Sequence, residues 1–213
     1  MHAPNDHHYR SVTMFTPKNT RPFLALIAAT LFAAQASAQA HEHPAAPDAP
    51  ASAESQQAFK ALKSIAGGYQ GYVTEPVNKL NALADVSLRV TSMGNVLVHE
   101  LKSAETTPNP LNGQHPVTVM YMDGANLLLT HYCDSGNRPR MTGRVSADGK
   151  VIDFDFLDVV GPLKYGHMQR ARFTIIDPTH HIEEWTWEAP DGKTVVAHFD
   201  LKKVAEYATI SGK

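Results

Sequence analysis

Short β-rich segments separated by tight turns are the feature that most constrains the fold of this chain. Asp123-Gly124, Asp148-Gly149 and Asp191-Gly192 each lie between such segments. Asp-Gly is a preferred sequence for tight hairpin turns, in which the glycine takes a positive φ. Alternation of apolar and polar residues, as in residues 86–92 (VSLRVTS), is typical of a strand that is buried on one face. The pattern therefore predicts a chain of antiparallel hairpins.

The segments between turns predict ten strands in one domain. Their expected ranges are 68–75, 82–92, 95–104, 117–122, 125–133, 139–147, 150–158, 167–176, 181–189 and 193–203. Ten sequential antiparallel strands leave two exposed edges unless the sheet closes. We therefore predict an all-β, up-and-down antiparallel barrel, with a β-sandwich as the alternative. One helix is expected before the strands, over Ser55–Ile65, with an apolar face that plugs or flanks one mouth of the barrel.

The first part of the chain has the pattern of a secretory signal. Basic residues precede the uncharged run Phe23–Ala34, and Ala36-Ser37-Ala38 supplies the small residues of a cleavage site. The apolar run is much shorter than the roughly 20 residues that a membrane-spanning helix needs. We predict that the protein is secreted or periplasmic, without a membrane span after cleavage.

These patterns divide the chain into three parts. Residues 1–38 are expected to be the signal peptide, residues 39–53 a disordered Ala/Pro-rich linker, and residues 54–213 the barrel domain. The formal charge is −2, with no basic block, which argues against a nucleic-acid partner. The single cysteine excludes an intramolecular disulfide and a multi-cysteine metal site. Nothing in the sequence indicates the oligomeric state.

Polar and reactive side chains are densest in Leu129–Met141 (LTHYCDSGNRPRM). Arg140 is of a type that binds planar anions bidentately. It could instead form a buried ion pair with Glu100, and both interpretations stay open. His131 and Cys133 lie two residues apart on a strand and should share a face.

Alternation predicts the direction of two more groups. His167 is expected to point inward together with Ala171, and Met168 outward. His131, Cys133 and His167 could then form a metal or acid/base site, although such residues on an apolar face are more often core. We expect no metal and no cofactor.

The strand with both tryptophans predicts part of the barrel lining. Trp185 and Trp187 share a face with Glu183, and Glu184 points the opposite way, so the two carboxylates form no acid/base pair. His180-His181 is expected at a hairpin tip in solvent.

Two stretches resemble a known class of proteins. A helix that leads into Ala66–Gly71 (AGGYQG) looks like the opening of lipocalin-like and other calycin barrels, with Tyr69 where tryptophan is usual. Leu129–Cys133, continued by Gly136–Met141 (GNRPRM), resembles a motif of uncharacterised secreted bacterial proteins with a lipocalin-like domain. Arg138 replaces a Gln of that motif. The similarity extends through His167 and Trp185 and implies a fold, because we know of no activity established for the family.

The number of strands gives a more distant similarity to nitrobindin-type barrels. Those barrels bind haem through a histidine near the end of the chain. His198 is the candidate that this similarity implies on the last predicted strand.

A ten-stranded barrel is wider than side chains alone fill, so a ligand cavity is expected. We predict a binding protein for a small, mostly apolar ligand, whose anionic head group, if present, Arg140 would hold. The candidate ligand-binding residues are Tyr69, Glu100, His131, Cys133, Asn137, Arg140, His167 and Trp185. Tyr69 is expected near the mouth and Trp185 in apolar contact. The alternatives are an enzyme with a His/Cys site and a haem-binding barrel.

Overall fold

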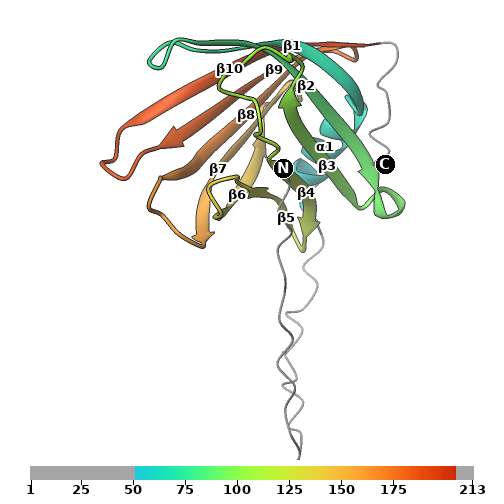
Figure 1. The fold of residues 1–213 in the computed structure, drawn as a ribbon. Coiled ribbons are helices and arrows are strands. Elements are labelled where there is room, and N and C mark those ends of the chain that lie inside the picture. Colours follow the sequence, from blue (N-terminus) through green and yellow to red (C-terminus); the bar gives the residue numbers. More distant parts are fainter. Residues whose placement is uncertain (1–50, 205–213) are drawn as a thin grey trace, which may run out of the picture. The chain divides into compact units, whose positions relative to one another are not determined.

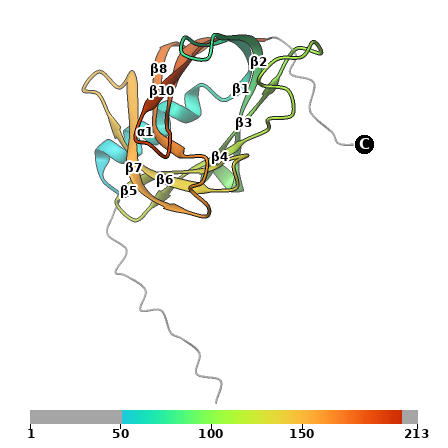
Figure 2. The same cartoon turned by 60° about the vertical axis from the view of Figure 1, so that its left-hand side comes forward.

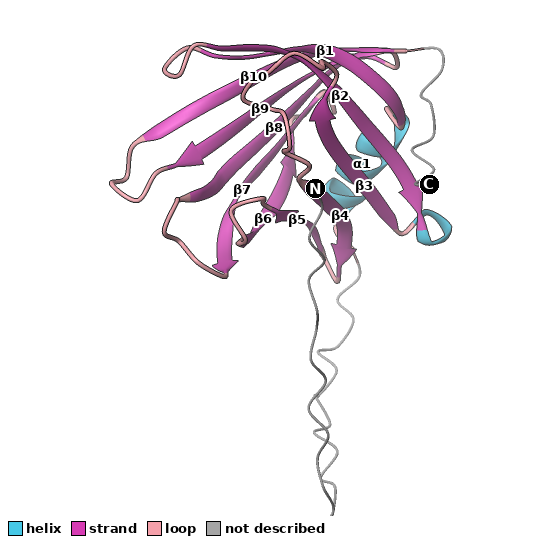
Figure 3. Ribbon diagram, in the orientation of Figure 1, coloured by secondary structure: helices cyan, strands magenta, loops and turns pink. Residues whose placement is uncertain are grey.

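The computed structural model describes residues 51–204 of the chain. The predicted signal peptide, most of the linker and residues 205–213 lie outside this range. Within the described range, one helix and ten strands follow one another (Figure 1, Figure 3). They are α1 (Ala53–Ser64), β1 (Gly67–Glu75), β2 (Leu80–Thr91), β3 (Val96–Ser103), β4 (Val117–Asp123), β5 (Asn126–Tyr132), β6 (Arg138–Val145), β7 (Val151–Val160), β8 (His167–Asp177), β9 (His180–Glu188) and β10 (Thr194–Lys203), with a short 3-10 turn, η1 (Ser92–Gly94), between β2 and β3.

The ten strands form one closed antiparallel barrel in which every strand pairs with its neighbours in sequence. β1 closes the ring by pairing with β10, from Tyr69 opposite Lys203 to Thr74 opposite His198. The predicted barrel is confirmed, and the sandwich is not formed. A Cβ atom at Gly71 would lie 1.8 Å from the carbonyl oxygen of Asp200, so glycine allows β1 and β10 to approach at the closure.

Helix α1 lies at one end of the barrel. Ser52 caps it by accepting a hydrogen bond from the Ser55 N–H, at 3.0 Å. The helix buries Phe59 and Leu62 in the same core as the barrel interior. It is tied to the turns at this end, because Lys63 Nζ donates to the Gly94 carbonyl at 3.1 Å. In Figure 1 α1 lies on the right, whereas the turn between β9 and β10 lies on the left, and Figure 2 shows the helix within the ring of strands.

One strand departs from simple alternation. The pairing of β8 with β9 shifts between Met168 and Arg170, which marks a β-bulge. Met168 is consequently opposite Trp187, and Ala171 is opposite Trp185, so both share the inner face. The predictions that His167 points inward and Met168 outward are wrong, because the bulge reverses the alternation on its N-terminal side.

No helix within residues 51–204 has the length and apolar character needed to cross a membrane.

Candidate functional site

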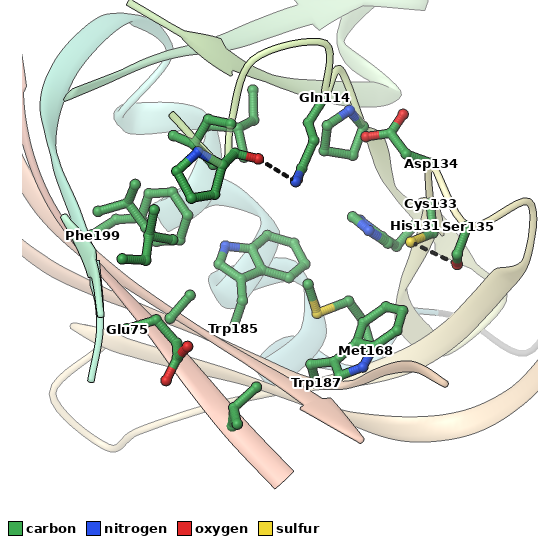
Figure 4. Close-up of a pocket in the computed structure, with 18 of the residues that line it drawn as sticks. Glu75, Gln114, His131, Cys133, Asp134, Ser135, Met168, Trp185, Trp187 and Phe199 are labelled. Carbon is green, nitrogen blue, oxygen red and sulfur yellow. Dashed lines mark hydrogen bonds between the residues drawn. The ribbon is translucent and has the colours of Figure 1, made fainter. Parts of the chain in front are cut away.

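A cavity of about 540 Å³ opens at the end of the barrel opposite α1 (Figure 4). Inner-face side chains of the strands form its wall, and residues of four connections form its rim: β1–β2, the long β3–β4 loop, β5–β6 and β7–β8. Its lining residues are Val73, Glu75, Asn78, Leu80, His99, Leu101, Pro110, Leu111, Gln114, Pro116, His131, Cys133, Asp134, Ser135, Tyr165, Met168, Trp185, Trp187, Val195, Ala197 and Phe199. Most of these side chains are apolar or aromatic, and none is a lysine or arginine.

The loop between β3 and β4 bends over the mouth of this cavity. Leu111 from the loop is buried in the barrel core. Gln114 Nε2 donates to the carbonyl oxygen of Pro110 at 2.6 Å, as drawn in Figure 4. The loop therefore contributes both an apolar anchor and a polar rim to the site.

A buried polar group lies at the floor of the cavity, and we call it the Glu183 cluster: Glu183, His99, His181 and Trp185. Glu183 Oε2 accepts from His99 Nε2 at 3.0 Å and from Trp185 Nε1 at 2.9 Å. Glu183 Oε1 accepts from His181 Nε2 at 2.9 Å. His99 and Trp185 line the cavity, whereas His181 packs edge-on against the Tyr69 ring, 4.4 Å between centroids. The cluster thus separates the cavity from the helix end of the barrel.

Glu183 is ionised in this setting. Its side chain is 0 % exposed, and burial alone would raise its pKa. The electrostatic interaction with His99 and the hydrogen bonds from His181 and His99 outweigh burial, so the pKa of Glu183 lies far below its usual value. Three N–H donors on one carboxylate explain how a charge can be kept inside the barrel.

His131 forms a second buried polar contact beside this cluster. Its Nδ1 lies 2.8 Å from Thr118 Oγ1, and its ring lies 5.3 Å from the Trp185 ring between centroids. Burial, with a further contribution from His99, lowers the pKa of His131 to about 3. The imidazole is therefore neutral at physiological pH.

Cys133 lines the cavity next to His131, as the sequence predicts (Figure 4). Its Sγ accepts a hydrogen bond from Ser135 Oγ at 3.1 Å. Residues 51–204 contain no His–Cys hydrogen bond at this position and no group of three His, Cys, Asp or Glu side chains placed to hold a metal ion. The geometry does not assemble His131, Cys133 and His167 into the metal or acid/base site that was considered as an alternative to a core role.

Tyr69 lies at the opposite end of the barrel from the cavity mouth. It is fully buried, and its hydroxyl donates to the carbonyl oxygen of Ile65 at 2.8 Å. Burial, together with Asp177 and Glu183, raises the pKa of Tyr69 to about 12. Tyr69 therefore links the end of α1 to β1. The prediction that Tyr69 lies near the mouth is wrong.

Arg140 and Glu100 both lie outside the cavity and do not pair with each other. Arg140 is opposite Thr130 in the β5–β6 pairing, which puts it on the outer face. Its guanidinium binds the Asp158 carboxylate through two hydrogen bonds, one of them Nε to Oδ1 at 2.8 Å. Glu100 is on the face of β3 opposite His99 and Leu101. Of the two interpretations left open for Arg140, the ion pair with Glu100 is not formed, because the pairing register brings Asp158 to Arg140, and Arg140 does not line the cavity to bind an anion there.

The remaining two candidate residues support loops and strand ends. Asn137 is fully buried, and its Nδ2 donates to the carbonyl oxygens of Pro162 at 3.0 Å and Gly166 at 2.7 Å. It thereby ties the β5–β6 turn to the β7–β8 connection. His167 packs its ring against Phe156, 4.8 Å between centroids, and does not line the cavity.

The histidine that a nitrobindin-like barrel would use for haem does not fit that role. His198 is half-exposed on the outer face of β10, with its Nδ1 3.9 Å from Glu184 Oε1. Ala197 and Phe199, its neighbours in the strand, are the residues that line the cavity. His198 therefore points away from the barrel interior.

The candidates predicted from the sequence did not include three residues of the site, His99, His181 and Glu183. The alternation of inward and outward side chains along their strands nevertheless indicates that they point inward. His99 lies between the inner-face residues Leu97 and Leu101. His181 and Glu183 lie four and two residues before Trp185, on the same face of β9. The expectation that His181 is in solvent is wrong: it is fully buried, because β9 already begins at His180.

Comparison with one solved structure supports the fold. The crystal structure of Rv2717c from M. tuberculosis superposes with a TM-score of 0.53 and 15 % sequence identity, covering 69 % of this chain and 97 % of that one. A protein of unknown function of the DUF3598 family from Nostoc punctiforme superposes with a TM-score of 0.45 and 8 % identity, covering 67 % of this chain. This chain spans about half of that second protein (49 %). No family model matches the chain. No curated protein matches it either.

Proposed function

We propose that this protein binds a small, mostly apolar molecule in the open end of its barrel. The observation that carries this proposal is the cavity of about 540 Å³, lined mainly by apolar and aromatic side chains with a few polar groups. Small-molecule sites in proteins have this character and a volume of about 300–1,000 Å³. The closed end is filled by α1, so the ligand enters through the opposite mouth.

The aromatic wall supplies the apolar contact. Both tryptophans of the chain line the cavity. Trp185 contacts the rings of His131 and Phe173 and donates its N–H to Glu183, which fixes the orientation of the indole. A rigid aromatic surface binds an apolar ligand without losing much side-chain freedom.

Filling the cavity tests the proposal. Ala197 on β10 lines the cavity, whereas its neighbour Val196 is 41 % exposed on the outer face. We expect the neutral fluorescent probe N-phenyl-1-naphthylamine to bind the native chain and the Val196→Trp variant, and to lose at least tenfold in affinity for Ala197→Trp. Absence of saturable binding to the native chain, or equal binding to both variants, contradicts the proposal.

We also propose that binding takes place outside the cytoplasm, on the basis of the signal-like pattern in residues 1–38. Intact-mass measurement of the exported chain should show a loss of residues 1–38. A chain that keeps these residues in the cell extract would contradict export by this route.

A further inference from the structure

Two imidazole nitrogens at the floor of the cavity lack a hydrogen-bond partner. Within the described residues, His131 Nε2 and His99 Nδ1 are buried and contact no donor or acceptor. Each histidine is only 4 % exposed, and each lines the cavity. Leaving a buried polar atom unpaired is costly, at roughly 1–3 kcal/mol per group. These atoms therefore mark a place where a ligand atom is needed.

The hydrogen-bond network assigns the hydrogens on His131. Thr118 is 1 % exposed, and the hydrogen bond that its hydroxyl makes in the described part of the chain is to His131 Nδ1. The hydroxyl hydrogen therefore donates to Nδ1, which acts as the acceptor. Because the ring is neutral, its own hydrogen is on Nε2. His131 thus offers an N–H donor to the cavity.

His99 offers a second polar atom. Its Nε2 carries a hydrogen, because it donates to the ionised Glu183 carboxylate. A hydroxyl group can pair with the unpaired Nδ1 whether that nitrogen accepts or donates. Both rings lie against the Trp185 ring, with centroid distances of 5.6 Å for His99 and 5.3 Å for His131. Two unpaired imidazole nitrogens therefore flank the same indole.

The charges around the cavity disfavour an anion. Among residues 51–204, no lysine or arginine lines it, whereas Glu75 and Asp134 do. Desolvation would raise the pKa of Glu75, but hydrogen bonds from the Asn78 and Val77 N–H groups lower it, so this carboxylate is charged. Glu183 adds a buried negative charge directly behind His99 and Trp185. A ligand carboxylate at the floor would be desolvated beside like charge.

We propose that the ligand is a neutral apolar alcohol, whose hydroxyl oxygen accepts from His131 Nε2 and whose hydroxyl group forms a second hydrogen bond with His99 Nδ1. A hydroxyl group is both donor and acceptor, so it matches the two unpaired atoms. This inference rests on the proposed function and replaces the expectation of an anionic head group. The hydrocarbon part packs on Trp185 and Trp187.

Competition among three probes of similar length tests this inference. At pH 7.5, 1-octanol should displace N-phenyl-1-naphthylamine at a concentration at least tenfold lower than octanoate. Heptyl methyl ether, which accepts but does not donate, provides the uncharged comparison. If the fluorescent probe does not bind at all, the proposed function fails. If it binds but octanoate competes as well as 1-octanol, the alcohol inference alone is overturned.

Substitution of His131 separates its hydrogen bond from general hydrophobic binding. His131→Phe should bind the fluorescent probe but lose at least fivefold in affinity for 1-octanol and for the ether alike, because both oxygens accept from His131 Nε2. His131→Gln, which retains an N–H donor, should restore part of that affinity. Thr130→Val, on the outer face of the same strand, is the matched control and should leave both affinities unchanged. Full affinity of His131→Phe for 1-octanol would contradict the assignment. The octanol–octanoate comparison on the native chain decides the inference even where a variant does not fold.

Discussion

Charged side chains occupy two contrasting regions of this barrel. Inside, the Glu183 cluster holds one carboxylate with three N–H donors, and the Glu183 side chain is 0 % exposed. Outside, arginines and aspartates alternate across β6, β7 and β8 in partly exposed ion pairs, such as Arg172 Nε to Asp153 Oδ1 at 2.7 Å. Water can replace a lost partner on the outer face but not in the interior. Similar contacts should therefore have very different effects on stability.

The comparison also bears on function. The outer Arg140–Asp158 pair is closed by a two-point contact, although Arg170 Nε, also on the outer face, lacks a hydrogen-bond partner within residues 51–204. In the same part of the chain the inner cluster leaves His99 Nδ1 and His181 Nδ1 unpaired and lies beside the unpaired His131 Nε2. The unsatisfied buried atoms of the two cavity-lining histidines, rather than the more numerous surface charges, are the basis for the proposed ligand site.

The largest effect is expected for Glu183→Gln. The substitution keeps the shape but removes the charge that accepts hydrogen bonds from His99, His181 and Trp185. We expect the free energy of unfolding to fall by about 3–5 kcal/mol, as when a buried ion pair is broken. Urea denaturation at pH 7 measures this. A loss of stability as small as that expected for a surface ion pair would contradict the difference between the interior and the outer face.

The pH dependence of the same variant sharpens this prediction. The folded-state pKa of Glu183 is depressed, so its stabilising contribution is present above the unfolded-state value near about 4.3. That contribution is lost as the pH falls below this value. The difference between the native chain and Glu183→Gln should therefore narrow in acid. A constant difference from pH 7 to the lowest accessible pH would show that Glu183 acts through packing.

The next largest effect is expected for His131, as a dependence of the free energy of unfolding on pH. Its folded-state pKa is about 3, whereas an unperturbed histidine titrates near about 6.5. Between these values the unfolded chain binds a proton that the folded chain does not, so stability falls as the pH is lowered through this window. One such group contributes up to about 1.4 kcal/mol per pH unit.

The measurement is urea denaturation at several pH values between 6.5 and 4. The comparison variant is His131→Leu combined with Thr118→Val, which removes both partners of the buried hydrogen bond. Its stability should fall less steeply with acid than that of the native chain. If the free energy of unfolding falls equally with pH in both proteins, burial does not lower the pKa of His131, and the prediction is wrong.

The smallest effect is expected on the outer face. Asp153 accepts from Arg170 and Arg172, and its side chain is 23 % exposed. Asp153→Asn should cost about 0.5–1 kcal/mol, less at high salt, because solvent screens the pair. Denaturation in low and high sodium chloride tests this. A salt-independent loss as large as that of Glu183→Gln would contradict the contrast.

The barrel could be predicted because its signals are local. Asp-Gly turns and two-residue alternation specify each hairpin, and the observed β1–β10 begin and end within two residues of the predicted ranges. Alternation also predicted the inward positions of His131 and Trp185, which line the cavity.

Features that depend on pairing between strands could not be predicted in the same way. The bulge at Met168–Arg170 reverses the direction of the side chains before it. Met168 therefore lines the cavity, and His167 does not. Arg140 pairs with Asp158 because of the register between β6 and β7, which local sequence patterns do not determine. The contact of His99 with Glu183 joins residues 84 positions apart across the barrel, and it exists only once the ring has closed.

The most direct test of binding in the cavity uses its two tryptophans. Trp185 and Trp187 are the two tryptophans of the chain, and both line the cavity, so the indole N–H signals in a nitrogen–proton correlation spectrum report on it directly. We predict that 1-octanol shifts both signals saturably in the native chain and in Val196→Trp, and that Ala197→Trp abolishes the shift of these two signals. Two indole signals that stay in place throughout the titration of the native chain, or that move equally in Ala197→Trp, would contradict a ligand site at the open end of the barrel.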